Sequence, residues 1–219
     1  MKKCVIVGAG TYGQVYVKYL SEVYDVQGFF DSNPSLHDTI INGYPVLGCV
    51  SEIPDYMNTH KEIAIFVPLG DNIRRVQLLQ LFEKDGYDLP SFIHKTVHLH
   101  DNVIVGKSVY ILPSSNVMPY TVIGDYTMIS MGVNIAHHVA ISEGCFFSQG
   151  CNIGASISIS KKVYFGMAAA VMTGVECIGT GALIGVGAVV IRNVPPKAVI
   201  IGNPGKLLRY TSEKGLKTK

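Results

Sequence analysis

The sequence predicts an α/β, Rossmann-like N-terminal domain over residues 1–92 and an all-β, left-handed parallel β-helix over residues 93–194. Two observations predict this division. A strand, a glycine turn and a helical pattern open the chain, and a six-residue hydrophobic period runs through its second half. Residues 195–219 leave the period at Pro195-Pro196 and are predicted to form a C-terminal cap and tail.

Composition narrows the class of protein. Hydrophobic residues make up 48% of the 219 residues and charged residues only 16%, which suits a long buried interior or an oligomer. A net charge of +2 indicates no nucleic-acid partner. The apolar run after Met1 ends at Gly8, and no stretch approaches the roughly 20 apolar residues of a membrane span. Five cysteines without CxxC spacing argue against a disulfide framework, so we expect a cytoplasmic protein.

The first feature along the chain is an apolar strand over residues 4–7 that runs into a glycine turn and then a helical pattern. Gly8, Gly10 and Gly13 make this turn a G-x-G-x-x-G motif. In such a context glycines let the backbone approach a phosphate, and the helix N-terminus supplies N–H donors. We therefore expect Gly8, Gly10 and Gly13 to line a nucleotide phosphate.

A second predicted strand, over residues 26–30, ends at Asp31. Asp31 lies near the spacing at which a ribose-binding acid follows the glycine motif in dinucleotide folds. NAD binding is one interpretation, and a tight turn without a ligand is another. A full dinucleotide fold usually needs a second βαβαβ half, for which a domain of about 95 residues leaves no room. A single half suits a nucleotide or a nucleotide-linked sugar.

A third predicted strand, over residues 63–67, runs into a loop that contains Gly70 and Asn72. Open α/β sheets bind ligands at the carboxyl ends of their strands, so both residues are expected near the nucleotide. Arg74 or Arg75 in the following helix is suited to pair with a phosphate. The alternative is a pair of solvated helix arginines.

The second half of the chain repeats every six residues. From Val105 to Val189 each sixth residue is apolar, fifteen positions in a row, and the residues two positions earlier are small or β-branched. Side chains at i and i−2 of a strand point to the same side, so each unit supplies a short strand and a turn, and three units close a triangular coil. Cys145, Cys151 and Cys177 fall in these inward registers, which predicts a packing role.

Several segments along the whole chain resemble one family, the bacterial sialic-acid O-acetyltransferases and nucleotide-aminosugar N-acetyltransferases that carry a Rossmann-like N-terminal domain. They are GAGTYG at 8–13, FFDSNP at 29–34, YPVLG at 44–48, VPLGDNIRR at 67–75, the repeat, and VPPKAVIIGNPGKLLR at 194–209. The resemblance implies a homotrimer. It also implies that the N-terminal domain holds a nucleotide-linked aminosugar and that acetyl-CoA lies between adjacent β-helices. No metal is expected, because His94, His98 and His100 have no Cys or acidic partner that repeats nearby.

The resemblance also implies site residues. His137 matches the family's catalytic histidine, and a histidine suits a general base near neutral pH. The family usually has Asp or Glu at the next position, where this chain has His138, so the partner that orients His137 is an open question. For the coenzyme, the matching region contains Ala155 and Gly185, and Lys206 is expected to reach a coenzyme phosphate.

The leading functional hypothesis is acetyl-CoA-dependent N-acetylation of a nucleotide-linked 4-amino-4,6-dideoxyhexose in bacterial surface-glycan biosynthesis. O-acetylation of a sugar of the sialic-acid type is a second hypothesis. A non-catalytic nucleotide-sensing or scaffold protein is a third, which the presence of His138 in place of an acid favours.

Overall fold

The structure is a computed structural model that describes residues 1–60 and 62–211. The predicted tail therefore lies outside the described residues beyond residue 211. The chain divides into two units, one of residues 1–70 and 74–90, the other of residues 71–73 and from 91 onwards. Among the described residues, no helix has both the length and the apolar character needed to cross a membrane.

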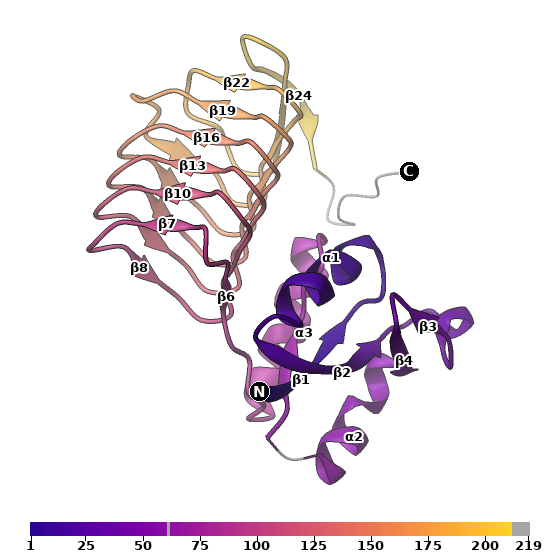
Figure 1. Ribbon diagram of the computed structural model, residues 1–219. Helices are drawn as coiled ribbons and strands as arrows, with labels where there is room; N and C mark the ends of the chain where they lie inside the picture. The colour runs from indigo at the N-terminus through magenta and orange to yellow at the C-terminus, as the bar shows by residue number, and fades with distance from the viewer. Residues whose placement is uncertain (61, 212–219) are drawn as a thin grey trace. The chain divides into compact units, whose positions relative to one another are not determined.

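The first unit is an α/β fold around a five-stranded sheet with the strand order β3-β4-β2-β1-β5 (Figure 1). The strands β1, β2, β4 and β5 are parallel, and β3 is antiparallel to β4. The elements are β1 (Lys2–Val7), α1 (Thr11–Leu20), β2 (Tyr24–Phe30), the 3-10 helix η1 (Pro34–Leu36), β3 (Ile40–Ile41), β4 (Tyr44–Gly48), the 3-10 helix η2 (Val50–Glu52), α2 (Ile53–Thr59), β5 (Ala64–Phe66) and α3 (Asn72–Lys84). The first two residues of α3, Asn72 and Ile73, are counted with the second unit.

The buried centre of this sheet explains the apolar runs in the sequence. The strand β1 pairs with β2 on one side and β5 on the other, and its residues Cys4 to Val7 are buried. A parallel strand covered on both faces needs a continuous apolar run instead of an alternating pattern. The predicted strand–turn–helix–strand order is confirmed, with the glycine turn at the carboxyl end of β1.

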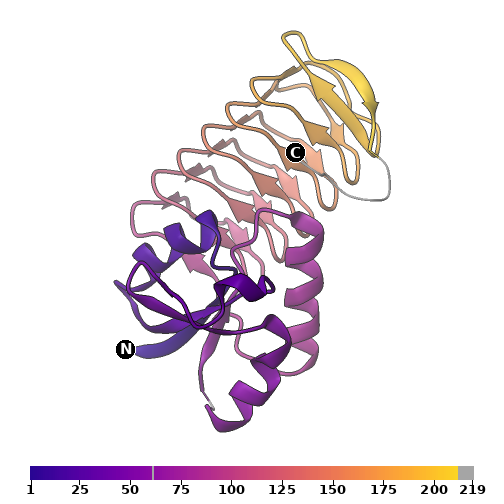
Figure 2. The same cartoon turned by 90° about the vertical axis from the view of Figure 1, so that its right-hand side faces the viewer.

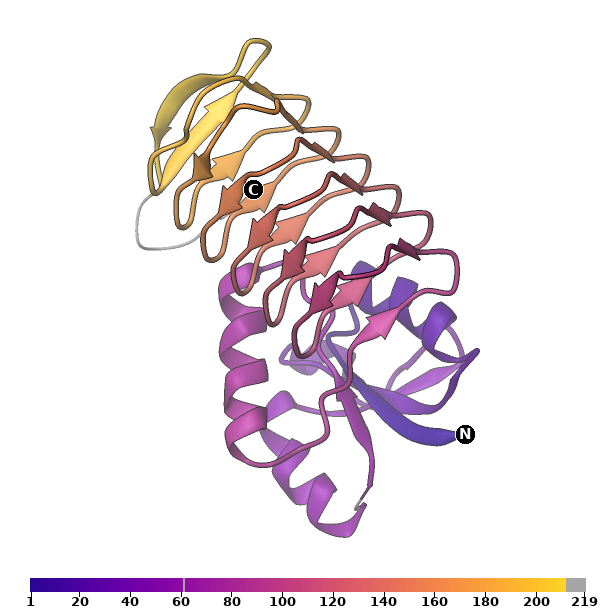
Figure 3. The same cartoon turned by 90° about the vertical axis from the view of Figure 1, so that its left-hand side faces the viewer.

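The second unit is a left-handed β-helix whose coils stack in register, as Figures 1 and 3 show. Its strands form three faces. Neighbouring strands within a face are parallel, except for the terminal pair β23 and β24. The β6 face holds β6 (Phe92–Ile93), β9 (Tyr110–Ile111), β12 (Met128–Ile129), β15 (Phe146–Phe147), β18 (Tyr164–Phe165), β21 (Leu183–Ile184), β23 (Ala198–Ile201) and β24 (Lys206–Tyr210). The β7 face holds β7 (His98–Leu99), β10 (Asn116–Val117), β13 (Asn134–Ile135), β16 (Asn152–Ile153), β19 (Ala170–Val171) and β22 (Val189–Val190). The β8 face holds β8 (Ile104–Val105), β11 (Val122–Ile123), β14 (Ala140–Ile141), β17 (Ser158–Ile159) and β20 (Cys177–Ile178).

Each coil takes three six-residue units, so a strand pairs with the strand 18 residues further on. Val117, for example, pairs with Ile135, and Ile135 with Ile153, and all three are buried. This confirms the predicted hexapeptide period. At the last coil β23 pairs with β24 in antiparallel fashion, and this hairpin ends the stack (Figure 2).

The prediction of the inward register is wrong after Val171. Ser158 pairs with Cys177 and Ile159 with Ile178, a step of 19 residues. Cys177 is consequently exposed and Ile178 fully buried, and the same slip moves the inward position from Val189 to Val190. The extra residue lies between Val171 and Cys177, and the backbone amides of Glu176 and Cys177 both donate to the Asn193 side-chain oxygen, at 2.8 and 3.3 Å.

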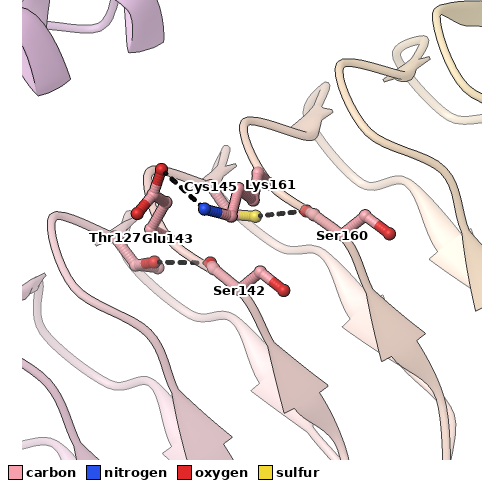
Figure 4. A network of polar contacts seen from close by, with 6 residues as sticks. All are labelled: Thr127, Ser142, Glu143, Cys145, Ser160 and Lys161. Atoms are coloured by element: carbon pink, nitrogen blue, oxygen red, sulfur yellow. Dashed lines mark hydrogen bonds and ion pairs between the residues drawn. The ribbon is translucent and has the colours of Figure 1, made fainter.

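Polar side chains in the inward register satisfy backbone carbonyls at the corners of the prism. Cys145 Sγ donates to the carbonyl of Ser160 at 3.2 Å, and Thr127 Oγ1 contacts the carbonyl of Ser142 at 3.5 Å (Figure 4). Cys151 is also buried, and burial raises the pKa of its thiol to about 12. The predicted packing role is therefore confirmed for Cys145 and Cys151, but not for Cys177.

The register slip makes a direct stability prediction. Ile178→Ala removes fully buried apolar atoms and should lower the free energy of unfolding by about 2–5 kcal/mol. Cys177→Ala, one residue earlier and exposed, should change it by less than about 0.5 kcal/mol. Chemical denaturation of both variants measures the difference. A larger loss of unfolding free energy in Cys177→Ala than in Ile178→Ala would instead support the six-residue register without a slip.

Candidate active site

The three glycines of the first loop differ in what their backbone positions require. Gly8 has a φ of +99°, and Gly13 lies so close to the Gly8 carbonyl oxygen that a Cβ would overlap it. A Cβ on Gly10 would meet nothing within 4 Å, and Gly10 is the residue that precedes α1, with no side-chain cap on the first-turn amides. Gly8 and Gly13 are thus needed by the fold, whereas Gly10 leaves open space at a helix N-terminus, as a phosphate site requires.

Asp31 closes the loop onto the end of β2. One carboxylate oxygen accepts from the backbone amide of Ala9 at 2.7 Å, and the other accepts from the amide of Asn33 at 2.8 Å. These hydrogen bonds hold the glycine loop in shape. A contact of Asp31 with a ribose stays a prediction, since each carboxylate oxygen can accept a further hydrogen bond.

The loop after β5 lies against the glycine loop. A Cβ on Gly8 would meet the Leu69 side chain at 2.6 Å, and a Cβ on Gly70 would lie 3.8 Å from the Tyr12 ring. Arg75 is fully buried and donates from Nη1 to the Leu69 carbonyl at 2.7 Å. Gly8, Gly10, Gly13, Asp31 and Gly70 therefore gather at the carboxyl ends of β1, β2 and β5.

Arg75 and Asn72 have surroundings that the sequence did not indicate. The alternative that Arg75 is a solvated helix arginine is wrong, because its side chain is fully buried. Asn72 is a buried residue of the second unit, and its amide donates to the carbonyl of Val163 at 3.3 Å. Contact of either residue with a nucleotide sugar stays a prediction.

His137 and His138 occupy the corner between β13 and β14. The residues on either side of the turn, Ile135 and Val139, point into the core, while both histidines are exposed. Thr121 fixes the turn from the coil before, because its hydroxyl donates to the Ala136 carbonyl at 2.9 Å and accepts from the Val139 amide at 3.3 Å.

The two imidazoles are hydrogen-bonded to each other. Nδ1 of His137 lies 3.0 Å from Nδ1 of His138, with the rings nearly perpendicular at 89°. The left-handed backbone of His138, with a φ of +58°, brings the consecutive side chains together. Because one Nδ1 donates and the other accepts, one of the two rings keeps an unprotonated Nε2 that can act as a base.

Tyr120 is a neighbour of this pair that the sequence reasoning missed. Its ring centroid lies 4.9 Å from that of His138, at an angle of 36°. The available signal was the 18-residue coil period, which puts position 120 directly beneath position 138 in the stack.

The three predicted coenzyme residues lie at two different corners. Ala155 follows His137 by one coil at the same corner, and its amide donates to Thr173 Oγ1 at 3.1 Å. Gly185 follows β21 on the β6 face, where its Cβ would lie 3.0 Å from Ile201, the strand partner of Lys206. The structure thus brings Gly185 close to Lys206 and Ala155 close to His137.

Comparison with known proteins shows which proteins this chain is similar to. The model of the PglD N-terminal domain matches residues 3–82. A crystal structure of a perosamine N-acetyltransferase variant from Caulobacter crescentus, in complex with CoA and GDP-perosamine, superposes with a TM-score of 0.88 at 25% identity and covers 94% of this chain and 97% of that one. The chain is thus similar in fold to a bacterial sugar acetyltransferase over almost its whole length. The acetyltransferase domain of PglB from Neisseria gonorrhoeae shares the fold at 22% identity, with a TM-score of 0.86 over 95% of this chain and the whole of that domain.

Curated sequence relatives match a shorter stretch of the chain. A Staphylococcus aureus protein that carries the provisional name of an acetyltransferase is 43% identical over 53 residues, which is 24% of this chain and 26% of the relative. Serine acetyltransferase from Buchnera aphidicola is 37% identical over 57 residues, 26% of this chain and 20% of that enzyme. The chain thus spans about a quarter or less of the length of these relatives.

The different glycine environments predict different effects of one substitution. Gly10→Val should weaken binding of a nucleoside diphosphate such as GDP or UDP by at least about 10-fold without lowering the thermal midpoint, because its side chain fills only the open space. Gly13→Val should unfold the N-terminal unit, since its Cβ collides with backbone. Calorimetric titration and thermal unfolding separate the two effects. Unchanged nucleotide binding by Gly10→Val would remove the loop from the site.

Proposed function

We propose that this protein transfers the acetyl group of acetyl-CoA to the amine of a nucleotide-linked 4-amino-4,6-dideoxyhexose, in the cytoplasm, as a step in bacterial surface-glycan biosynthesis. The observation that carries the proposal is the exposed His137, whose Nδ1 is engaged by His138 and whose Nε2 is available to a substrate. The relative bound to CoA and GDP-perosamine supports a nucleotide-linked aminosugar as acceptor.

The proposed chemistry needs one base. As the amine nitrogen attacks the thioester carbonyl, a C–N bond forms and Nε2 of His137 takes a proton from the nitrogen. The tetrahedral intermediate then collapses, the C–S bond breaks and coenzyme A leaves as the thiolate. The thiolate takes the proton from Nε2 of His137. The histidine therefore supplies general-base catalysis, typically a factor of about 10²–10⁴.

The remaining roles divide between the two units. In the first, the space at Gly10 and the α1 amides suit the diphosphate of the sugar nucleotide, with Asp31, Gly70 and Arg75 as the further residues we assign to it. In the second, we assign Ala155, Gly185 and Lys206 to acetyl-CoA. Ala155 and Gly185 lie at different corners of the β-helix. If three copies pack side by side as a homotrimer, each chain would therefore contact one coenzyme A molecule through Ala155 and another through Gly185.

An acceptor panel tests the activity. Protein with acetyl-CoA and a thiol-detecting dye should release thiol with UDP-, dTDP- or GDP-linked 4-aminosugars and not with sialic acid. His137→Asn should lower kcat about 10²–10⁴-fold and leave the acetyl-CoA KM nearly unchanged, because only the transition state loses the interaction. Thiol release with sialic acid alone would indicate the O-acetyltransferase. Nucleotide binding without thiol release would indicate the sensing or scaffold protein.

The homotrimer has its own test. Light scattering at micromolar concentration should give about three times the chain mass of 23.7 kDa. A monomer mass at full activity would show that a single β-helix suffices for catalysis.

A further inference from the structure

Three rings form a contact series at the corner that carries His137. Tyr120 lies one coil before His138, and the turns of the two coils are joined by a hydrogen bond from the His138 amide to the Pro119 carbonyl at 3.2 Å. Tyr120 and His138 share the left-handed backbone, with φ of +63° and +58°. Their side chains therefore leave the stack at equivalent positions, which brings the Tyr120 ring against the His138 ring and His138 against His137.

A histidine cannot replace a carboxylate in this place without a consequence. A carboxylate only accepts, so it forces the neighbouring histidine to donate from Nδ1 and to keep Nε2 unprotonated. A neutral imidazole allows two arrangements. If His137 donates, its Nε2 is the free base. If His138 donates, His137 carries its proton on Nε2 and cannot take one from the substrate.

We propose that Tyr120 is a positioning residue which, by packing on the His138 ring, holds His138 as the acceptor that keeps Nε2 of His137 unprotonated. The inference rests on the proposed function, and it adds a residue and a tautomer to it. The backbone hydrogen-bond partners of the pair, Pro119 in the coil before and Ser156 in the coil after, are uncharged. The Tyr120 ring, 58% exposed, lies tilted at 36° to the His138 ring with the two centroids 4.9 Å apart.

We call the arrangement in which Tyr120 positions His138 and His138 orients His137 the relay. Kinetics of matched variants test it. Tyr120→Leu should lower kcat about 10-fold, less than loss of the base itself, with both KM values unchanged. Tyr120→Phe, which keeps the ring, should restore most of the rate. Tyr210→Leu is the matched control, because Tyr210 is as exposed, at 56%, and lies in the terminal hairpin. It should leave kcat unchanged.

A variant with a carboxylate at position 138 tests the tautomer of His137 more directly. His138→Glu should retain activity and move the ascending limb of the pH–rate profile to higher pH, because a carboxylate favours the charged imidazolium. In that background Tyr120→Leu should have almost no further effect, since the carboxylate fixes the tautomer by itself. Loss of activity in His138→Glu comparable to that in His137→Asn, or additive effects of the two substitutions, would overturn the relay.

A spectroscopic measurement separates this inference from the proposed function. Long-range ¹H–¹⁵N spectra of histidine-labelled protein distinguish the two tautomers, and loss of signals in His137→Asn and His138→Asn assigns two of the seven histidines. The relay requires a protonated Nδ1 on His137 and a protonated Nε2 on His138, with loss of this preference in Tyr120→Leu. The reverse pattern overturns the relay even if the acceptor panel succeeds, and the expected pattern supports it even if no acceptor is found.

Discussion

Hydrogen bonding between successive coils is the constraint on which the second unit depends. Its strands are mostly two residues long, and a strand of that length has no stability alone. Each coil therefore needs the amides and carbonyls of its neighbours, as in the bonds from Ser156 to His137 and from His138 to Pro119. Once the backbone is locked in this way, residues 18 apart must stack, because a different register would leave backbone groups unpaired. The Tyr120–His138 contact and the position of Ala155 one coil beyond His137 both follow from this register.

The same constraint explains what the sequence could and could not predict. A strict six-residue period specifies a coil of 18 residues, so the fold and the inward positions from Val105 to Val171 could be predicted by counting. The slip that exposes Cys177 could not, because one residue is added close to two backbone amides that donate to a side chain from a later coil, Asn193. At the candidate active site, the hydrogen bond between the two histidines could not be predicted, since it depends on the backbone of His138.

In the N-terminal unit, the glycine motif predicted the position of the loop. It did not predict which of its residues the fold requires and which leave space for a ligand. Gly8 and Gly13 are required by backbone conformation and close packing, and only Gly10 has space for a ligand. Asp31 has the spacing of a ribose-binding acid, yet both its oxygens accept backbone amides. Arg75 has the charge of a phosphate-binding residue, yet it is buried beneath the loop that it supports through Leu69. A spacing rule identifies residue types near a site, whereas these roles depend on packing between segments distant in the sequence.

The turn at His137 carries residues that its left-handed backbone conformation disfavours. Left-handed backbone favours glycine or asparagine, and glycine takes such positions at Gly132 and Gly150. At positions 120 and 138 the chain instead carries a tyrosine and a histidine, of which a tyrosine is the less favourable in this conformation. The strain is compensated by the stack itself, because the coil hydrogen bonds hold both turns in place. What this arrangement provides is two rings in contact and a second imidazole against His137. A glycine or asparagine at these positions would satisfy the fold equally well but would provide neither ring. Other turns of the stack also carry bulky left-handed residues, such as Tyr126 and Lys162, so the conformation alone does not distinguish this corner; the contact between the two rings does.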